Sequence, residues 1–310
     1  MCLSVAVMAG RKYGLVHYLM LLVGIFFAYS LLSSYFSSSG ASMNPVYLGY
    51  SKDEVKTVTA SYHDGRATVK LADTHLANFD SFWSWLPTWK PNLLNAIDKY
   101  VDETTIFVDA GAWEGPALFY AARKAAMSLA LEPDHAAFRA LRAHNQVNPE
   151  LENVILSPYC LSDRTEKIKM AGNGEGSSAI ERVPLKFEDE KIRLGAEGVF
   201  TVSCYPLQEF LAGKGVRSEK RLFIKMDLQG AESYILPTLT EWVAARAVKP
   251  VIFLGIHETL ENTRREKIGK ILTFVQLFKL CGRDVDDLGP CSAITADSLK
   301  GMHDMILADY

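Results

Sequence analysis

The sequence predicts an α/β fold in which a mostly parallel sheet carries helices on both faces. After residue 104, short apolar runs alternate with longer amphipathic segments, an order that covers a parallel sheet on both sides. The first run, residues 105–110, is apolar and rich in β-branched residues, as a buried strand is. It ends in a glycine turn before Pro116, a residue suited to the first turn of a helix.

Length and composition restrict the organisation and the partners. At roughly 150 residues per domain, 310 residues make one large domain or two small ones. The formal net charge of −3 shows no basic excess, so no nucleic-acid partner is expected. The five cysteines form no C-x-x-C pair, which predicts neither a disulfide framework nor a zinc site. Pairing of Cys281 with Cys291 in an oxidising compartment stays open.

Residues 13–35 are predicted to form a transmembrane signal anchor, because this run is uncharged and long enough to span a bilayer core. Arg11 and Lys12 precede it, so the positive-inside rule places the short tail, residues 1–12, in the cytosol. The rest of the chain is then luminal, in the endoplasmic reticulum or Golgi, although a cytosolic orientation stays open. A cleaved signal peptide and a buried core helix are the alternatives to an anchor.

Residues 36–50 have the Ser-rich composition of a stem, and residues 51–104 are predicted to form an N-terminal cap. Alternating residues around Asp64-Gly65 predict a hairpin, and residues 92–101 a short helix. The aromatic cluster from Phe82 to Trp89 is expected to pack the cap onto the main domain. A platform for a sugar or aromatic substrate is the alternative.

Residues 105–310 are predicted to form the main domain. Its strands are expected at residues 106–109, 128–131, 154–156, 201–205, 222–226 and 251–256, with the last strands at 292–295 and 305–308. Helices are expected near residues 117–126, 135–146, 207–211, 231–245 and 261–280. A Gly- and Ser-rich insertion at 171–178 interrupts this order and is predicted to be an exposed loop or a mobile lid.

The turn after the first buried strand reads Asp109-x-Gly111-x-x-x-Gly115 and differs from the G-x-G-x-x-G of dinucleotide sites. A carboxylate at this turn disfavours a pyrophosphate and suits a ligand with an ammonium group. Glu132 ends the next strand about 20 residues on, where a carboxylate accepts hydrogen bonds from ribose hydroxyls. Together they indicate a nucleoside without a pyrophosphate, such as S-adenosylmethionine. The alternative is that both acids only stabilise helix N-termini.

Over about residues 105–258 the sequence resembles the FkbM-type methyltransferases, a class I S-adenosylmethionine-dependent family. The resemblance rests on blocks in the expected order: Val-Asp-Ala-Gly-Ala-Trp-Glu-Gly (108–115), Leu-Glu-Pro-Asp (131–134), Cys-Leu-Ser-Asp (160–163), Lys-Met-Asp-Leu-Gln-Gly-Ala-Glu (225–232) and Ile-His-Glu (256–258). The block at 225–232 is the most specific of them. Gln208, Gln229 and the pair Trp113-Glu114 depart from the family pattern.

The resemblance implies a Rossmann-like, seven-stranded and mostly parallel sheet, and methyl transfer, usually to oxygen. It implies that Asp109, Gly111 and Gly115 hold the methionine part of the cofactor. Glu132 would hold the ribose, and Asp163 would lie near the adenine. We expect the acceptor to be a hydroxyl or carboxyl group, such as that of a glycan, a lipid or a small metabolite.

Asp227 and His257 are the candidate catalytic residues, because both follow strands at the edge where open α/β sheets bind ligands. We expect Asp227 to position or deprotonate the acceptor, with His257 as the second choice. Lys225, in a buried strand, is expected to pair with a carboxylate. No metal site is predicted; a divalent cation bound by the carboxylates of Asp227 and Glu258 is the alternative. An inactive cofactor-binding scaffold and a nicotinamide-dependent oxidoreductase are the competing functions.

Overall fold

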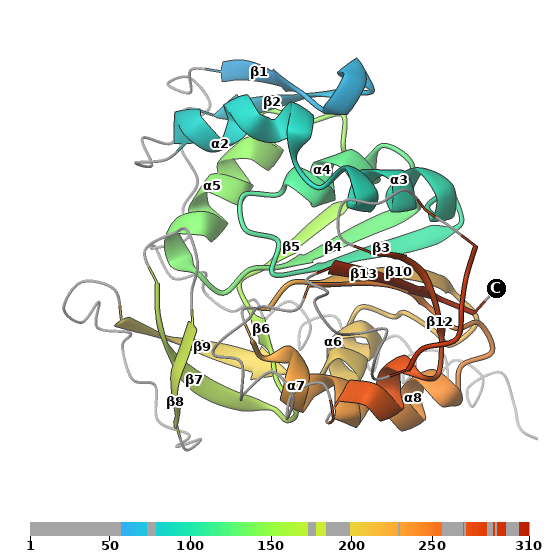
Figure 1. The fold of residues 1–310 in the computed structure, drawn as a ribbon. Coiled ribbons are helices and arrows are strands. Elements are labelled where there is room, and N and C mark those ends of the chain that lie inside the picture. The colour runs from blue at the N-terminus through green and yellow to red at the C-terminus, as the bar shows by residue number, and fades with distance from the viewer. Residues whose placement is uncertain are drawn as a thin grey trace, which may run out of the picture. The chain divides into compact units, whose positions relative to one another are not determined.

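The computed structural model describes residues 57–72, 79–172, 178–183, 199–228, 230–255, 269, 271–283, 288, 290–295 and 304–309 (Figure 1). All of them belong to one compact unit, Gly49–Tyr310. The predicted tail, anchor and stem, residues 1–50, lie outside this set. Within the part of the chain that is described, no helix has the length and apolar character needed to cross a bilayer.

The main sheet has seven strands in the order β12-β13-β11-β10-β3-β4-β5. Their bounds are β3 Thr105–Ala110, β4 Met127–Leu131, β5 Val154–Ser157, β10 Arg221–Met226, β11 Val251–Gly255, β12 Lys279–Arg283 and β13 Asp304–Ala308. Only β13 runs against its two neighbours, while the other pairings are parallel. The predicted seven-stranded, mostly parallel sheet is confirmed, and it fits the class I methyltransferase fold.

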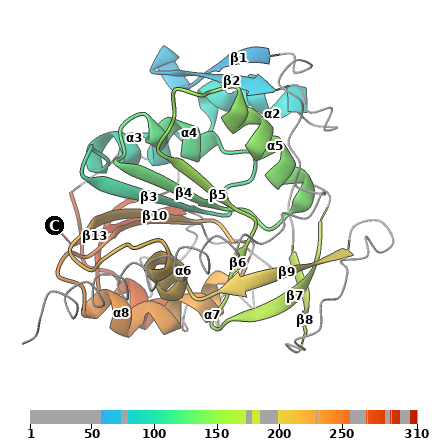
Figure 2. The same cartoon turned by 180° about the vertical axis from the view of Figure 1, so that it is seen from behind.

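Helices cover both faces of this sheet, as predicted (Figures 1 and 2). On one face lie α3 (Pro91–Tyr100), α4 (Pro116–Ala122) and α5 (His135–Gln146). On the other lie α6 (Leu207–Gly213), α7 (Glu232–Ile235) and α8 (Thr240–Ala244). The single helix predicted over 231–245 is instead broken, because Pro237 has no N–H to continue it and a 3-10 turn, η4 (Leu236–Leu239), separates α7 from α8.

The strands alternate between these two faces. On β3, Ile106, Val108 and Ala110 belong to the apolar core formed with α6 to α8. Phe107 points to the opposite face, where its ring lies 5.5 Å from that of Phe223. Asp109 and Lys225 lie two positions further along these strands and share that second face. They are charged rather than apolar.

The N-terminal cap contains the predicted hairpin. Its strands β1 (Thr57–Ser61) and β2 (Thr68–Ala72) pair antiparallel, and a 3-10 turn, η2 (His63–Gly65), connects them. The aromatic cluster forms α2 (Phe79–Trp85) and η3 (Leu86–Thr88). Trp83 is buried and its Nε1 donates to the Glu114 carboxylate at 2.9 Å, which confirms that this cluster packs the cap onto the main domain.

One predicted strand of the main sheet lies elsewhere. Residues 201–205 belong to β9 (Val199–Tyr205), in a second sheet of order β6-β9-β7-β8. The other strands of that sheet are β6 (Cys160–Leu161), β7 (Glu166–Ala171) and β8 (Ser178–Val183). Along β9, buried Phe200, Val202 and Cys204 alternate with more exposed residues, the pattern of an antiparallel sheet covered on one face. Of the predicted lid, residues 173–177 lie outside the description.

Two C-terminal elements differ from those that the sequence predicts. A helix was expected to reach Leu280, but the described helical residues end at Val275 and β12 begins at Lys279. Buried Phe278 and Leu280 have the period of a strand, and pairing with β13 decides between the two periodicities. The strand expected at 292–295 is only a bridge from Ser292 to Leu280.

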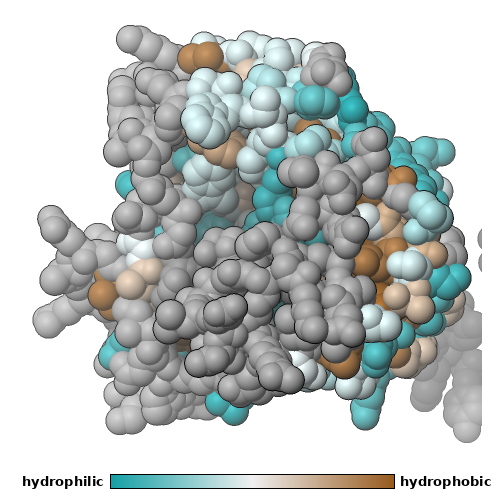
Figure 3. Space-filling view, in the orientation of Figure 1, coloured by the Kyte–Doolittle hydropathy of each residue, from teal (hydrophilic) through white to brown (hydrophobic). Residues whose placement is uncertain are grey.

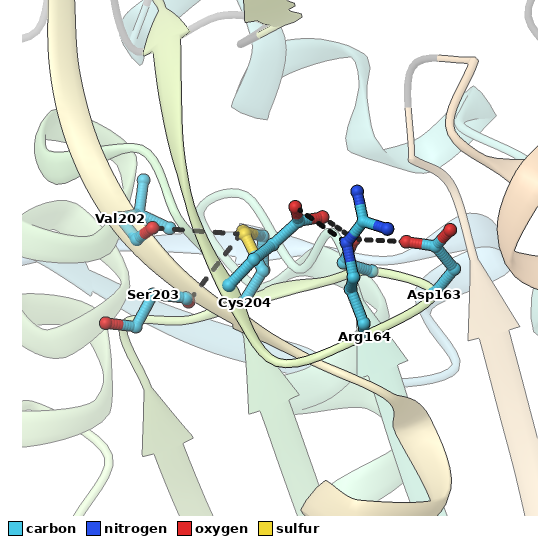
Figure 4. Close-up of a disulfide and its surroundings, with 8 residues drawn as sticks. Asp163, Arg164, Val202, Ser203 and Cys204 are labelled. Carbon is cyan, nitrogen blue, oxygen red and sulfur yellow. Dashed lines mark hydrogen bonds and ion pairs between the residues drawn. A yellow bond between two sulfur atoms is a disulfide. The ribbon is translucent and has the colours of Figure 1, made fainter. Parts of the chain in front are cut away.

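Two disulfides join four of the five cysteines, so the prediction of no disulfide framework was wrong. Cys281 pairs with Cys291, the pairing that the sequence left open. Cys160 and Cys204 face each other across the β6–β9 pair and are bonded (Figure 4). They are 44 residues apart in the chain, and only the strand pairing brings them together.

Candidate functional site

The carboxyl ends of β3 and β10 form the topological switch point of the sheet. From β3 the chain continues to β4 and β5 on one side, and it later forms β10 and β11 on the other. Open α/β sheets bind ligands where the strand order reverses in this way. The turn after β3 and Asp227 after β10 therefore lie on the two sides of the expected binding crevice.

The turn at 111–115 depends on its glycines. Gly111 has φ +77°, and a Cβ there would lie 2.2 Å from the carbonyl oxygen of Asp227. Gly115 has φ +94°, and a Cβ there would lie 2.6 Å from side-chain carbons of Leu141 and Phe119. Both positions are restricted to glycine by packing within the protein as well as by backbone conformation. Their predicted contact with a cofactor stays a prediction.

Glu132 is held beside this turn by backbone donors. The N–H of Trp113 donates to its Oε2 at 2.7 Å and the N–H of Asp134 to its Oε1 at 2.8 Å. Burial raises the pKa of Glu132 to about 7, although these two N–H groups oppose the shift. A buried carboxyl group at the carboxyl end of β4 is therefore fixed in position and titrates near neutral pH.

Asp109 and Lys225 are register partners on β3 and β10 and form a buried ion pair. The Lys225 Nζ lies 2.8 Å from Asp109 Oδ1 and 2.7 Å from the carbonyl oxygen of Gly111. Burial acts to lower the pKa of Lys225, but Asp109 and Asp227 together raise it above its ordinary value. The predicted carboxylate partner of Lys225 is confirmed. The Lys225 ammonium donates to one oxygen of Asp109. The sequence analysis predicts the ammonium group of a ligand at this carboxylate.

Asp227, directly after β10, contacts Lys90, which in turn contacts Asp304, and the sequence analysis missed both of these partners. The Oδ2 of Asp227 is 3.3 Å from the Nζ of Lys90, and this Nζ is also 3.0 Å from Oδ1 of Asp304. A Cβ on Gly255, at the end of β11, would lie 3.3 Å from Oδ1 of Asp227 and 3.5 Å from Oδ1 of Asp304. The lack of a side chain at Gly255 thus leaves room for both carboxylates.

A sequence signal for Asp304 existed. It immediately precedes the strand predicted at 305–308, and an antiparallel last strand brings its start to the edge where the parallel strands end. Lys90 had a weaker signal, its position directly after the aromatic cluster. Neither signal could show that the two residues meet.

Two residues near the switch point have a strained backbone. Lys90 has φ +37° and Trp113 has φ +51°, and among the described residues they are the two non-glycine residues with positive φ. Such conformations persist only where the surrounding structure enforces them, and they cluster at functional sites. One of these residues contacts Asp227, and the other donates its N–H to Glu132.

A buried polar cluster connects the cap to the turn. Glu114 Oε2 accepts from Trp83 Nε1 and lies 3.4 Å from His144 Nε2. Since His144 Nδ1 accepts the backbone N–H of Ala72 at 3.0 Å, we assign the ring proton to Nε2, which then donates to Glu114. Glu114 therefore has a structural role in holding the cap.

The remaining predicted residues are less informative. Asp163 follows β6, beside the Cys160–Cys204 disulfide, and its Oδ1 lies 3.2 Å from the hydroxyl of Ser162 (Figure 4). Its proximity to an adenine stays a prediction. His257 and Glu258 lie outside the described residues. Within the described ranges, no group of three or more His, Cys, Asp or Glu residues is arranged to hold a metal ion.

In comparisons with known proteins, no family model matches the chain, and no curated protein matches it. Among solved structures, it is similar to Trm5b of Pyrococcus abyssi, with 10% identity and a TM-score of 0.39. That match covers 82% of this chain but only 55% of Trm5b.

Two further matches have similar scores. TYW2 of M. jannaschii, in complex with AdoMet, is 13% identical with a TM-score of 0.34, over 83% of this chain and 86% of that one. A precorrin-6y C5,15-methyltransferase of Geobacter metallireducens is 10% identical with a TM-score of 0.36, over 70% and 86%.

Proposed function

We propose that the chain is an S-adenosylmethionine-dependent methyltransferase that methylates an oxygen of a hydroxyl or carboxyl acceptor. The observation that carries the proposal is the Glu132 carboxyl group, fixed by two backbone N–H groups beside a glycine turn at the switch point of the sheet. The ordered sequence blocks shared with FkbM-type methyltransferases support it.

The residues at the turn fit this cofactor. Each oxygen of Glu132 accepts one backbone N–H, and a carboxylate oxygen has a second lone pair free for a ribose hydroxyl. The turn from Gly111 to Gly115 would receive the methionine part, with Asp109 behind it. Asp163 would lie on the adenine side.

In the proposed reaction, Asp227 acts on the acceptor and not on the cofactor. When bound, S-adenosylmethionine supplies a methyl group already activated on a sulfonium. The protein has to hold an acceptor oxygen in line with that methyl group and to accept the proton of a hydroxyl. In our proposal the Asp227 carboxylate accepts the proton, and Lys90 orients Asp227 from 3.3 Å. His257 stays a second candidate for the base.

The test combines binding with turnover. Calorimetry should detect S-adenosylmethionine binding, and a panel of hydroxylated and carboxylic acceptors should then release S-adenosylhomocysteine. Asp227→Asn should keep cofactor binding and lose turnover by about 10²- to 10⁴-fold, the range for a general base. Asp102→Asn is the matched control, because Asp102 precedes the start of β3 at the opposite edge of the sheet. Near-full turnover by Asp227→Asn would remove this residue from the mechanism.

An inactive cofactor-binding scaffold is the main alternative, because Gln208 and Gln229 replace family residues. Tight cofactor binding with no product from any acceptor would favour it. Binding of NAD without binding of S-adenosylmethionine would instead favour the oxidoreductase.

For location, we propose that residues 13–35 anchor the chain in a membrane of the secretory pathway with the main domain in the lumen. The two disulfides support an oxidising compartment. Translation with microsomes should yield a full-length product whose main domain resists protease until detergent is added. Digestion in intact microsomes would show a cytosolic domain, and loss of an N-terminal piece would show a cleaved signal peptide.

A further inference from the structure

Two neighbouring residues of α2, in the cap, contact two neighbouring residues of the turn at 111–115. The indole Nε1 of Trp83 donates to Oε2 of Glu114 at 2.9 Å. The ring of Phe82 lies edge-on to the ring of Trp113, with centroids 4.4 Å apart. Because α2 precedes β3 and the turn follows it, the turn is held by residues outside its own stretch of chain.

The hydrogen-bonded contact is buried. Trp83 is 5% exposed and Glu114 is 3% exposed, and the Nε2 of His144 lies 3.4 Å from the same Glu114 oxygen. Just beyond the turn, the buried hydroxyl of Tyr62, another cap residue, donates to the carbonyl oxygen of Pro116 at 2.8 Å. Breaking such a bond leaves a buried polar group without its partner, which is costly. The cap is therefore expected to stay in contact with the turn and with the start of α4.

Trp113 connects these contacts to the site. Its φ of +51° is a left-handed conformation, which costs free energy in a residue other than glycine. A conformation of this kind persists where the surrounding structure enforces it. Phe82 contacts the Trp113 ring, and Trp83 holds the side chain of the next residue. In this conformation the N–H of Trp113 donates to Oε2 of Glu132 at 2.7 Å.

We propose that Trp83 and Glu114 are positioning residues for the cofactor. They hold Trp113 in the conformation that directs its N–H to Glu132, and the Glu132 carboxyl group is thereby fixed for the ribose. This inference rests on the proposed function and adds the cap to the residues on which cofactor affinity depends. A purely structural role for Trp83 would lower stability on substitution and leave the titration of Glu132 unchanged.

The first test needs no cofactor. Trp83→Phe removes the Nε1 donor and keeps an aromatic ring. NMR of isotope-labelled glutamate carboxyl groups follows titration in the full chain, and the Glu132 signal is the one lost in Glu132→Gln. Burial raises the pKa of Glu132 to about 7, and the N–H groups of Asp134 and Trp113 oppose that rise. Weakening of the Trp113 bond should therefore raise the pKa of Glu132 further, by about one unit.

The charged groups that act on Glu132 stay in place in this variant. The Asp134 carboxylate, at the start of α5, raises the pKa of Glu132, and Lys225 on β10 lowers it. A change in the titration therefore reports the Trp113 N–H. An unchanged pKa of Glu132 in Trp83→Phe would overturn the inference.

Substitutions of Glu114 provide a conservative pair. Glu114→Gln keeps one side-chain oxygen, which can accept from both Trp83 and His144. It should keep the pKa of Glu132 near its native value, whereas Glu114→Ala removes the acceptor and should raise that pKa as Trp83→Phe does. Equal pKa values in the two Glu114 variants would contradict positioning through this hydrogen bond.

Two further variants separate positioning from stability. Trp85→Phe is the same exchange in the same helix, at a residue that is 71% exposed. The outer surface over α2 is pale in Figure 3, of intermediate hydropathy. Val69→Ala removes buried apolar volume from β2 and should lower the melting temperature. Neither should change the pKa of Glu132, and an equal rise in Val69→Ala would show that general loosening of the cap is responsible.

The second test measures cofactor affinity by calorimetry. If the pKa of Glu132 rises by about one unit, S-adenosylmethionine affinity in Trp83→Phe should fall about fivefold or more at about pH 7, and less at about pH 9, where Glu132 is ionised in both chains. In a Glu132→Gln background, Trp83→Phe should have little further effect, because the two residues act through one contact. A loss of affinity that is the same at every pH and in both backgrounds would contradict the inference.

The two proposals fail differently. Absence of S-adenosylmethionine binding by the native chain would remove the proposed function, while the titration of Glu132 still decides whether Trp83 positions it. Native binding together with an unchanged titration in Trp83→Phe would remove the inference alone.

Discussion

The two sides of the expected binding region are built in different ways. The proposed cofactor end comes from one continuous stretch, residues 109–134, with Lys225 added from β10. The proposed acceptor end joins residues far apart in the chain: Lys90 contacts Asp227 and Asp304 across 137 and 214 positions. Their burial differs too, since the side chains of Asp109 and Lys225 are 0% and 5% exposed, against 16–23% at the acceptor end.

This difference in burial predicts that substitutions at the cofactor end lower stability more than substitutions at the acceptor end. At the cofactor end, buried charges must be paired and hydrogen-bonded. A substitution that removes one partner therefore strongly lowers the free energy of unfolding. At the acceptor end, partial exposure screens the charges, so substitutions cost little stability and act mainly on the substrate. The following predictions test that contrast.

The largest effect on stability is expected for Lys225→Met. It leaves Asp109 buried without its partner, which costs about 3–5 kcal/mol of unfolding free energy. Denaturant titration measures the loss. The double variant Lys225→Met/Asp109→Asn should recover much of it, because neither charge then remains. A loss below about 1 kcal/mol in the single variant would contradict the assigned cost of this pair.

Gly111→Ala should also destabilise the cofactor end. The left-handed backbone costs roughly 1–2 kcal/mol for alanine, and the clash of its Cβ with the Asp227 carbonyl roughly 1–3 kcal/mol more. Gly215→Ala is the matched control, since φ is +72° there and no atom lies within 4 Å of the added Cβ. The difference between the two unfolding free energies isolates the clash. Equal losses would show that the turn relaxes easily.

The pH dependence of cofactor binding should follow Glu132, whose pKa is raised from 4.5 to about 7. Ribose hydroxyls donate to the carboxylate, so S-adenosylmethionine affinity should fall about tenfold per pH unit below about pH 7. Without cofactor, the sign is opposite. The folded state binds this proton more tightly than the unfolded state, so the contribution of Glu132 to stability decreases as the pH rises from 4.5 to about 7.

Calorimetry between about pH 6 and about pH 8 checks the affinity, and Glu132→Gln should remove both dependences. An affinity that does not change over this range in the native chain would contradict contact of Glu132 with the cofactor.

The smallest stability effect is expected for Lys90→Met, within about 1 kcal/mol, because this lysine is partly exposed. Its S-adenosylmethionine affinity should be unchanged, while kcat/KM for the acceptor should fall. Comparison with Lys225→Met by the same denaturant titration tests the contrast directly, since both variants remove one lysine charge next to carboxylates. Equal losses of stability would remove the distinction between the two ends.

Much of the fold could be predicted because its signals are local. The start of α5 was predicted correctly, since Asp134 caps it by accepting from the N–H groups of Ala136 and Ala137. The buried strands β3, β4 and β10 were evident from continuous apolar runs. The second sheet was not, because alternation along β9 does not say which strands pair with it. The Cys160–Cys204 disulfide was missed for the same reason.

The sequence by itself determined the strand, glycine turn and acid that form the cofactor end. Those features depend on backbone conformation and on hydrogen bonds between residues close in the chain, such as that from Trp113 to Glu132. Only the tertiary structure decided which charges meet Asp227. Lys90 reaches it through the docking of the cap, and the reversal of β13 brings Asp304 to the same lysine. Contacts over such separations leave no periodic trace in the sequence.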